Sequence, residues 1–592
     1  MATESKVTVA HYLFTRLRQV GIKSLHGVAG EYDIEALEYL EGAGLKWVGC
    51  ANELNAGYAA DGYARVKGIS ALFTPSGASS LAALSPLAGP FAENIPVVHI
   101  VSCPSPSQLD GQAHHALKND NSNLGLFADM HKRVTIAQTH LNDTATAAAD
   151  IDRLLQTCYQ RSRPIYLALP TSILAAEVIA TPLATPLSIL PQPNTPEIEA
   201  TASAAILFQL YQATRPCILV DGGALRRKIT PVVEKFVRES KLPTFVTAAG
   251  KSAIDESLAN FAGVYTAENG GAMRDFIGGS DCVIWIGGLG DASNAPAGFP
   301  KGLSTLRTIA FHDSYAEVGY ARYTVHMRGI LNRLSSVIDL SRVKTTPFRP
   351  SYPRSGDSPG SDYSGLTAGD FAKLSLSKHS DITITHAWLW RKLSEWLQPG
   401  DILLTECGAA FKGVSETVLP NGCLAISQTL CKSCGYALPA AQGAALAARE
   451  QGRLGRTVVF VGERGLQATA QAVGTMLQHN LDVTVFVITD RIFGTNKGYV
   501  TDETEKSVAR KPWGDMPKWH NGNVPAAMGG KTMLGRGQER RERAFRTYGV
   551  MTKEEVERLW GEKEFKEAGG MNFVEMYMPK DEAPRAAKLA CR

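Results

Sequence analysis

Apolar runs of strand length alternate with helical segments along nearly the whole chain, and this pattern constrains the fold most. Examples are PIYLALP (164–170), PCILVDGG (216–223), DCVIWIGG (281–288), DILLTE (401–406), RTVVFVG (456–462) and DVTVFVIT (482–489). Strands that alternate with helices form parallel sheets covered by helices on both faces. The sequence therefore predicts an α/β protein built from doubly wound parallel sheets.

Two segments of loop-like composition divide the chain into three predicted domains. Residues 345–365 are rich in Pro, Ser and Gly and poor in aliphatic residues, which indicates a linker. A weaker boundary lies at residues 181–200, which contain five prolines. We expect an N-terminal domain over residues 1–185, a central domain over 200–344 and a C-terminal domain over 366–592. The polar, basic segment 506–546 is predicted to be a loop.

Composition and charge argue against several classes of protein. The net charge of +4 over 592 residues is close to neutral, so it gives no reason to expect a nucleic acid or a membrane surface as a partner. No apolar run is long enough to span a membrane, and the N-terminus lacks the apolar core of a signal peptide. Ten cysteines in so long a chain do not indicate a disulfide framework. We therefore expect a reduced, cytoplasmic protein.

Acidic residues follow two neighbouring predicted strands, together with an arginine. Glu463 and Arg464 come directly after RTVVFVG, and Asp490 ends the strand that follows. Because acidic side chains at adjacent strand ends can share a cation, Glu463 and Asp490 are predicted metal ligands. Arg464 would compete with that cation. It would either pair with Glu463 or Asp490 in place of a metal, or bind an anionic ligand directly.

Stretches spread along the chain resemble one enzyme family. They are HGVAGEYDIEAL (26–37), CANELNAGYAADGYARVKG (50–68), FAENIPVVHIV (91–101), GQAHHALKND (111–120), LPTFVTAAGKSAIDE (242–256) and AISQTLCKSCGYALPAAQGAALAA (425–448). Together they resemble pyruvate decarboxylase and its indolepyruvate and phenylpyruvate relatives, which use thiamine diphosphate (ThDP) and Mg²⁺. The resemblance implies pyrimidine-binding, central and diphosphate-binding domains in that order, a small-molecule carbonyl substrate, and a homodimer or homotetramer.

The resemblance also implies which residues carry the chemistry. Glu53 matches the glutamate that protonates the pyrimidine ring of ThDP, and the pair His114 and His115 matches residues of proton transfer. Glu31 stands where the family has an aspartate. Lys432 stands at a usual glycine, where it could bind a substrate carboxylate or stabilise an enolate. The predicted catalytic residues are therefore His114, His115, Glu31, Glu53 and Lys432.

The residues that match the cofactor anchor depart from the family pattern. The family sequence Gly-Asp-Gly-Ser is here Gly462-Glu463-Arg464-Gly465, and the Asn-Asn that closes it is Thr489-Asp490. Cys434 replaces a bulky aliphatic residue, and alanines follow Gly408 where the family supplies hydroxyls. The positions that match the ThDP site are Glu53, Gly408, Cys434, Gly462, Glu463, Arg464 and Gly465. Each lost hydrogen bond to a charged phosphate should cost about 1.5–3 kcal/mol. We therefore expect no cofactor, with ThDP and Mg²⁺ present only if the family chemistry is retained.

Three functions follow from this combination. The first is a cofactor-independent acid–base or C–C bond reaction on a carbonyl compound in specialised metabolism, such as an aldol-type, cyclising or isomerising step. The second is a ThDP- and Mg²⁺-dependent decarboxylase or carboligase of 2-oxo acids. The third is a non-catalytic partner subunit. The first is favoured because Glu31, Glu53, His114 and His115 are present while the anchor is altered.

Overall fold

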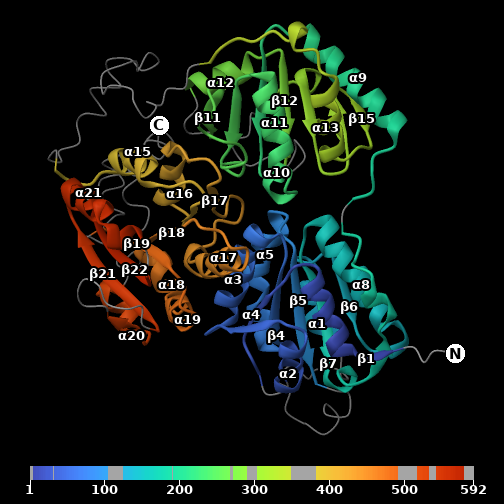
Figure 1. The fold of residues 1–592 in the computed structure, drawn as a ribbon, viewed down its shortest axis with the longest axis vertical. Helices are drawn as coiled ribbons and strands as arrows, with labels where there is room; N and C mark the ends of the chain where they lie inside the picture. The colour runs from blue at the N-terminus through green and yellow to red at the C-terminus, as the bar shows by residue number, and fades with distance from the viewer. Residues whose placement is uncertain are drawn as a thin grey trace, which may run out of the picture.

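The computed structural model describes residues 5–30, 33–104, 125–189, 191–266, 271–289, 303–348, 382–490, 517–532, 542–567 and 569–578. These residues form three α/β domains in chain order, coloured blue to teal, green, and yellow to red in Figure 1. Each domain is built on a sheet of mostly parallel strands, so the predicted fold class is confirmed. No helix within these ranges is long and apolar enough to cross a membrane. The predicted linker 345–365 lies largely outside them. Within the segment 506–546, predicted to be a loop, the described residues include α20 (Val524–Ala527), β20 (Lys531–Thr532) and the start of β21 (Ala544–Val550), so the prediction is wrong there.

The N-terminal domain has a six-stranded sheet in the order β3-β2-β4-β5-β7-β6, and all of its strand pairs are parallel. Every residue of β5 and β7 is buried, because helices cover both faces of the sheet. The strands are β2 (Ser24–Gly27), β3 (Lys46–Gly49), β4 (Ser70–Pro75), β5 (Val97–Cys103), β6 (Ala137–His140) and β7 (Ile165–Pro170), and β1 (Lys6–Thr8) pairs separately with β8 (Glu177–Ile179). The helices are α1 (Val9–Gln19), α2 (Ile34–Gly42), α3 (Glu53–Lys67), α4 (Ala78–Ala82), α5 (Leu84–Ala92), α7 (Gly125–His131) and α8 (Thr144–Arg161).

The central domain has a seven-stranded sheet in the order β11-β10-β9-β12-β13-β14-β15, and its last two strand pairs are antiparallel. This edge differs from the predicted all-parallel sheet. Only residues 312–315 separate β13 from β14, which is too short for the crossover that a parallel pair needs. The strands are β9 (Pro216–Val220), β10 (Thr244–Thr247), β11 (Phe261–Tyr265), β12 (Cys282–Ile286), β13 (Thr308–Phe311), β14 (Ala316–Val318) and β15 (Ala321–Tyr323). The helices are α9 (Pro196–Gln212), α10 (Gly223–Arg226), α11 (Thr230–Ser240), α12 (Gly271–Gly278) and α13 (Met327–Val337).

The C-terminal domain has a seven-stranded, fully parallel sheet in the order β17-β16-β18-β19-β22-β21-β20. The strands are β16 (Ile402–Thr405), β17 (Leu424–Ile426), β18 (Thr457–Gly462), β19 (Val483–Asp490), β20 (Lys531–Thr532), β21 (Ala544–Val550) and β22 (Met571–Met578). The helices are α15 (His386–Trp396), α16 (Ala409–Gly413), α17 (Ala437–Glu450), α18 (Glu463–Thr469), α19 (Ala472–Gln478), α20 (Val524–Ala527), α21 (Lys553–Gly561) and α22 (Lys563–Lys566).

Helices α3 and α17 join the N-terminal domain to the C-terminal domain, and they lie side by side in the centre of the molecule (Figure 1). They cross at glycines: a Cβ on Gly62 would overlap the backbone oxygen of Ala440, and a Cβ on Gly443 would overlap that of Ala59. The missing side chains therefore let the two backbones touch.

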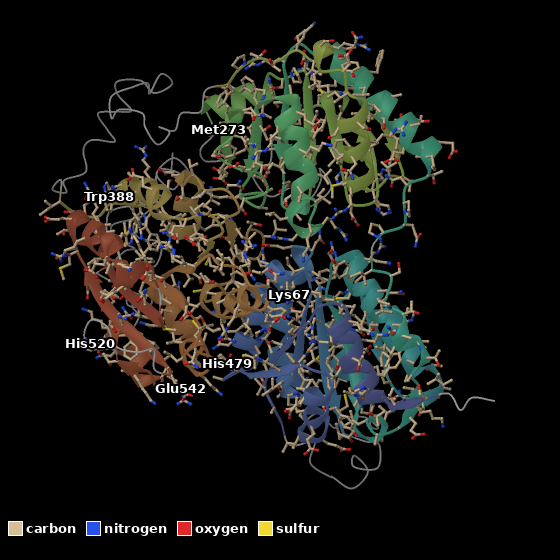
Figure 2. The ribbon with its side chains drawn as sticks, viewed as in Figure 1. Lys67, Met273, Trp388, His479, His520 and Glu542 are labelled. Atoms are coloured by element: carbon tan, nitrogen blue, oxygen red, sulfur yellow. The ribbon has the colours of Figure 1, made fainter. Side chains whose placement is uncertain are left out.

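One carboxylate at the C-terminal end of α17 forms hydrogen bonds and an ion pair with the N-terminal domain. Glu450 accepts hydrogen bonds from Ser24 Oγ (2.6 Å) and from Tyr63 OH (2.5 Å). It also pairs with Lys67 Nζ at 3.3 Å, and Lys67 lies at this junction in Figure 2. The relative position of the two domains is thus set by close packing and by a shared acidic residue.

His26 lies in β2 and is fully buried, and no described residue forms a hydrogen bond with either ring nitrogen. The ring packs edge-on against Tyr63, with the ring centroids 5.4 Å apart. Burial, and to a smaller extent the positive charge of His479, lowers the pKa of His26 from 6.5 to about 3. The folded protein therefore holds this imidazole in its neutral form.

We expect the free energy of unfolding to fall as the pH drops from about 6.5 toward 3. In this window the unfolded chain protonates His26 and the folded chain does not, so the unfolded state binds the extra proton. One such proton weakens folding by up to about 1.4 kcal/mol per pH unit. Urea unfolding at about pH 7, 6 and 5 measures the slope.

The matched variant is His26→Phe, which cannot be protonated and should show a shallower slope than the wild-type protein. Burial also lowers the pKa of His99 and of His131, so these residues contribute to the slope in both proteins. Only the difference between the two slopes is assigned to His26. Identical slopes in the two proteins would contradict the prediction.

Candidate functional site

Glu53 is the first residue of α3, the helix that crosses α17. The side-chain oxygen of Asn52 accepts a hydrogen bond from the backbone N–H of Asn55 (2.8 Å), which is a typical cap for a helix start. Glu53 is half-buried, and Ser79 Oγ donates a hydrogen bond to its Oε1. No described residue forms a hydrogen bond with Oε2. The carboxylate is therefore held in place while one oxygen stays available to a ligand.

Glu463 and Arg464 are the first two residues of α18, directly after β18 ends. β18 is an interior strand of the sheet, so both residues lie at the carboxyl end of an interior strand. Glu463 Oε1 accepts a hydrogen bond from Asn521 Nδ2 at 3.1 Å. Arg464 is exposed, and within the described part of the chain no ion pair joins it to Glu463. The hypothesis that Arg464 pairs with Glu463 therefore finds no support. The alternative partner is Asp490, whose side chain lies outside the described residues.

Two glycines near this point border open space. A Cβ at Gly408 or at Gly462 would meet no atom within 4 Å. Gly462 is the last residue of β18, and Gly408 comes shortly after the end of β16. These two strands pair directly and in parallel, so both glycines lie at the carboxyl ends of neighbouring strands. Gly408 also has a φ of 101°, in the left-handed region where other residues are strained. An anionic group can therefore approach the backbone closely at both glycines.

Glu406, which the sequence analysis did not select, is a buried carboxylate between these elements. It accepts hydrogen bonds from the backbone N–H groups of Gly435 (3.1 Å) and Ala437 (3.0 Å), and Cys407 Sγ lies 3.3 Å from it. Burial raises its pKa. A Cβ at Gly465 would lie 2.9 Å from Glu406 Cγ, so the side chain of Glu406 accounts for a glycine at this position. The signal in the sequence was an acid directly after the strand-like run of β16.

The loop before α17 carries the predicted residues Lys432 and Cys434. Lys432 has a φ of 50°, so the backbone keeps a conformation that favours glycine although a lysine stands there. Its Nζ lies 5.9 Å from the centroid of the Phe411 ring, and its side chain is exposed. Burial and Glu406 raise the pKa of the Cys434 thiol, and the nearby charge of Arg464 partly offsets this rise. The fold therefore brings both Glu406 and Arg464 close to Cys434.

Asp33 is a second acid that the sequence analysis did not select. It is fully buried near the end of β2, and its Oδ2 accepts a hydrogen bond from Gly30 N at 2.7 Å. Ser102 Oγ is close enough to lower the pKa of Asp33, but among the described residues no hydrogen bond of good geometry reaches Asp33 Oδ1 or Ser102 Oγ. Burial raises the pKa of Asp33. No pattern in the sequence pointed to it, because only the burial of the turn makes this acid unusual.

Several predicted site residues cannot be placed. Glu31, His114 and His115 lie outside the described residues. Among the described residues, no group of three or more His, Cys, Asp or Glu side chains could hold a metal ion. This finding does not test the predicted metal ligands Glu463 and Asp490, because the side chain of Asp490 lies outside the described residues. In addition, no hydrogen bond or ion pair joins Glu53 to a described residue of the C-terminal domain.

Comparisons with known proteins cover all three domains. Residues 7–125 match the N-terminal TPP binding domain of thiamine pyrophosphate enzymes, where TPP is another name for ThDP. Residues 203–334 match the central domain of these enzymes, and residues 414–551 match their C-terminal TPP binding domain.

Curated relatives are similar over the full length. The chain is 40% identical to pyruvate decarboxylase of Aspergillus fumigatus over 595 residues, which covers 98% of this chain and 96% of that protein. It is 39% identical to pyruvate decarboxylase of Aspergillus terreus, with the same coverage of both chains. It is 30% identical to pyruvate decarboxylase isozyme 1 of Saccharomyces cerevisiae, over 98% of this chain and 97% of that protein.

Proposed function

The chain belongs to the pyruvate decarboxylase family of thiamine diphosphate enzymes, and on this premise we propose that it is a ThDP- and Mg²⁺-dependent lyase of a 2-oxo acid, working as a decarboxylase or a carboligase. The observation that carries the proposal is Gly462. Its φ of −83° suits any residue, and a Cβ there would meet no atom. Neither its backbone nor its packing needs a glycine, and the position at the carboxyl end of β18 leaves room for a ligand to approach the backbone closely.

The described residues fit such a cofactor. When bound, ThDP would supply the electron sink for the carbon that loses CO₂. Glu53 would hold a proton at its free Oε2, with Ser79 fixing the other oxygen. The exposed guanidinium of Arg464 would neutralise part of the diphosphate charge. Glu463 and Asp490 are the proposed ligands of Mg²⁺, which prefers carboxylate oxygens.

We expect ThDP to bind saturably and stoichiometrically in the presence of Mg²⁺. Isothermal titration calorimetry on the purified protein measures this binding. Arg464→Gln should weaken it about tenfold or more, because a hydrogen bond to a charged group contributes about 1.5–3 kcal/mol. Arg133→Gln, at an exposed position in the N-terminal domain, is the control and should leave the affinity unchanged. The absence of any ThDP binding at millimolar concentration would refute the proposal.

A second candidate is a cofactor-independent acid–base reaction on a carbonyl compound, with Glu31, Glu53, His114, His115 and Lys432 as its catalytic residues. Alanine at positions 409 and 410 and glycine at 465 favour it, because none of them can donate a hydrogen bond from a side chain to a phosphate. Turnover of a carbonyl compound by protein from which ThDP has been removed would support this second function and contradict the first. The assembly into a homodimer or homotetramer stays a prediction under both.

A further inference from the structure

Two cysteines lie on the loops that border the candidate site. Cys407 follows β16 and is half-buried, and Cys434 lies exposed in the loop between β17 and α17. Glu406 connects the two loops, because its Oε1 accepts a hydrogen bond from Cys407 Sγ at 3.3 Å and another from the backbone N–H of Gly435 at 3.1 Å. One carboxylate oxygen therefore holds the thiol of Cys407 close to the residue that follows Cys434.

The electrostatics of the two thiols agree with this geometry. Burial, the carboxylate of Glu406 and the thiol of Cys434 raise the pKa of Cys407 to about 12. Burial and Glu406 also raise the pKa of Cys434, and the charge of Arg464 partly offsets this rise. Both thiols are thus close to Glu406, and Cys407 is close to Cys434 as well. Cys434 is the more exposed of the two and the first that a reagent can reach.

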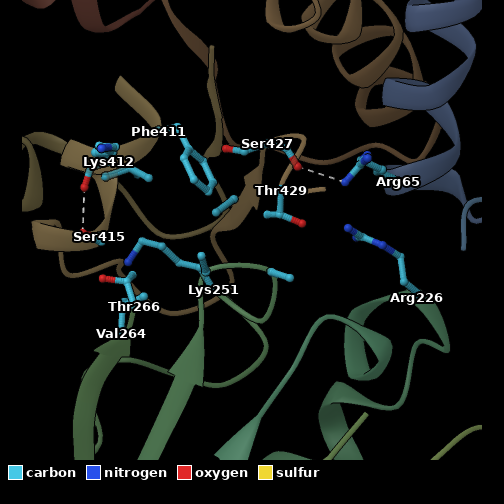
Figure 3. Close-up of a pocket in the computed structure, with 14 residues that line it drawn as sticks. Arg65, Arg226, Lys251, Val264, Thr266, Phe411, Lys412, Ser415, Ser427 and Thr429 are labelled. Carbon is cyan, nitrogen blue, oxygen red and sulfur yellow. Dashed lines mark hydrogen bonds between the residues drawn. The ribbon is translucent and has the colours of Figure 1, made fainter. Parts of the chain in front are cut away.

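Cys431 stands three residues before Cys434, and a C-x-x-C spacing alone would suggest that these two pair. Their surroundings differ, however. Arg65 Nη1 donates a hydrogen bond to the backbone oxygen of Ser427 at 3.2 Å, which holds the start of the loop near α3 (Figure 3). Burial and Glu93 raise the pKa of Cys431, and Arg65 lowers it. Cys431 therefore faces charges of the N-terminal domain, whereas Cys434 faces those of the C-terminal domain.

We propose that Cys407 and Cys434 form a reversible disulfide by exchange with a small-molecule disulfide such as glutathione disulfide. The thiolate of Cys434 attacks one sulfur of glutathione disulfide, so a mixed disulfide forms and one glutathione leaves as a thiolate, which takes up a proton. Cys407 then gives its proton to Glu406 or to water, and its sulfur attacks that of Cys434. The second glutathione leaves in the same way. The protein pair is oxidised, and glutathione disulfide is reduced to two thiols.

The bridge would join the loop after β16 to the loop before α17. Gly408 is the residue next to Cys407, and a Cβ there would meet no atom within 4 Å. A covalent link at this point narrows the space that the proposed function assigns to the diphosphate of ThDP. This consequence rests on the proposed function, whereas the formation of the disulfide does not.

Peptide mapping of the full-length protein tests the disulfide. The reduced protein is treated with excess glutathione disulfide, its remaining thiols are alkylated, and it is digested with trypsin. Cleavage after Lys412 and after Lys432 places Cys407, Cys431 and Cys434 in three different peptides. We expect the protein to lose two hydrogen atoms and the peptides of Cys407 and Cys434 to be linked, and dithiothreitol should reverse both changes. A link between Cys431 and Cys434, glutathione retained on Cys434, or no modification would each overturn the proposal.

Serine variants assign the two steps. Cys407→Ser should retain glutathione on Cys434, because the second thiol is missing. Cys431→Ser is the matched control and should form the same disulfide as the wild-type protein. If Cys407→Ser does not fold, Cys434→Ser should leave Cys407 without glutathione, because the pKa of this half-buried thiol is raised. Loss of the disulfide in Cys431→Ser, or glutathione on Cys407 in Cys434→Ser, would contradict the assignment.

Calorimetry with ThDP and Mg²⁺ compares the reduced protein with the oxidised protein. The oxidised form should bind ThDP at least about tenfold more weakly, and dithiothreitol should restore the affinity. Equal affinities would overturn the proposed effect on the site. No ThDP binding by the reduced protein would instead refute the proposed function, and the peptide map still decides whether the disulfide forms.

Discussion

Glu53→Gln is expected to lower the turnover of a 2-oxo acid by about 10²–10⁴-fold while the protein stays folded. Glutamine keeps the length and can still accept the hydrogen bond from Ser79, but it can no longer take up and release a proton. The change therefore removes proton transfer at Oε2 with little change in packing. CO₂ release from pyruvate, phenylpyruvate or indolepyruvate identifies a substrate, and the wild-type and variant proteins are then compared on it.

The control is Glu41→Gln, an exposed glutamate of α2, which should leave turnover unchanged. Calorimetry with ThDP shows whether the loss lies in binding or in the chemical steps. The dependence of wild-type turnover on added ThDP separates the two candidate functions, because both assign proton transfer to Glu53. A variant with near-wild-type turnover would contradict the role assigned to Glu53.

Gly62→Ala and Gly443→Ala are each expected to reduce the free energy of unfolding by about 3 kcal/mol, the upper end of the usual cost of overpacking. The added methyl group would overlap a backbone oxygen of the facing helix, at Ala440 in one case and at Ala59 in the other. A backbone atom in a packed helix cannot move aside as a side-chain end can, so the helices must separate. Urea unfolding measures the loss, and limited proteolysis reports whether the domains come apart.

Gly42→Ala is the control for these two variants. Gly42 also belongs to a helix, α2, but a Cβ there would meet no atom within 4 Å. Alanine should leave stability unchanged or raise it by up to about 1 kcal/mol, because it favours helix more than glycine does. Equal losses in all three variants would contradict the prediction, because only Gly62 and Gly443 lie at the crossing of α3 and α17.

Part of the site could be predicted because some of its residues stand next to recognisable patterns in the sequence. Gly462 ends the apolar run that forms β18 and Glu463 follows it, and an acid directly after a strand is visible in the sequence. Glu406 follows β16 in the same way and was missed, because the strand-end rule does not say which acids are buried. The role of Arg464 could not be settled either, since its pairing depends on side-chain positions across two strands.

The class of fold could be predicted from local patterns in the sequence. Alternation of apolar runs with helical segments is a local property, and it is enough to specify parallel sheets covered on both faces. The crossing of α3 and α17 and the packing of Glu406 against Gly465 emerge only in the folded molecule. Each of these features joins residues that are far apart in the chain. Their distances and charges are set only when the domains pack, so no local pattern in the sequence encodes them.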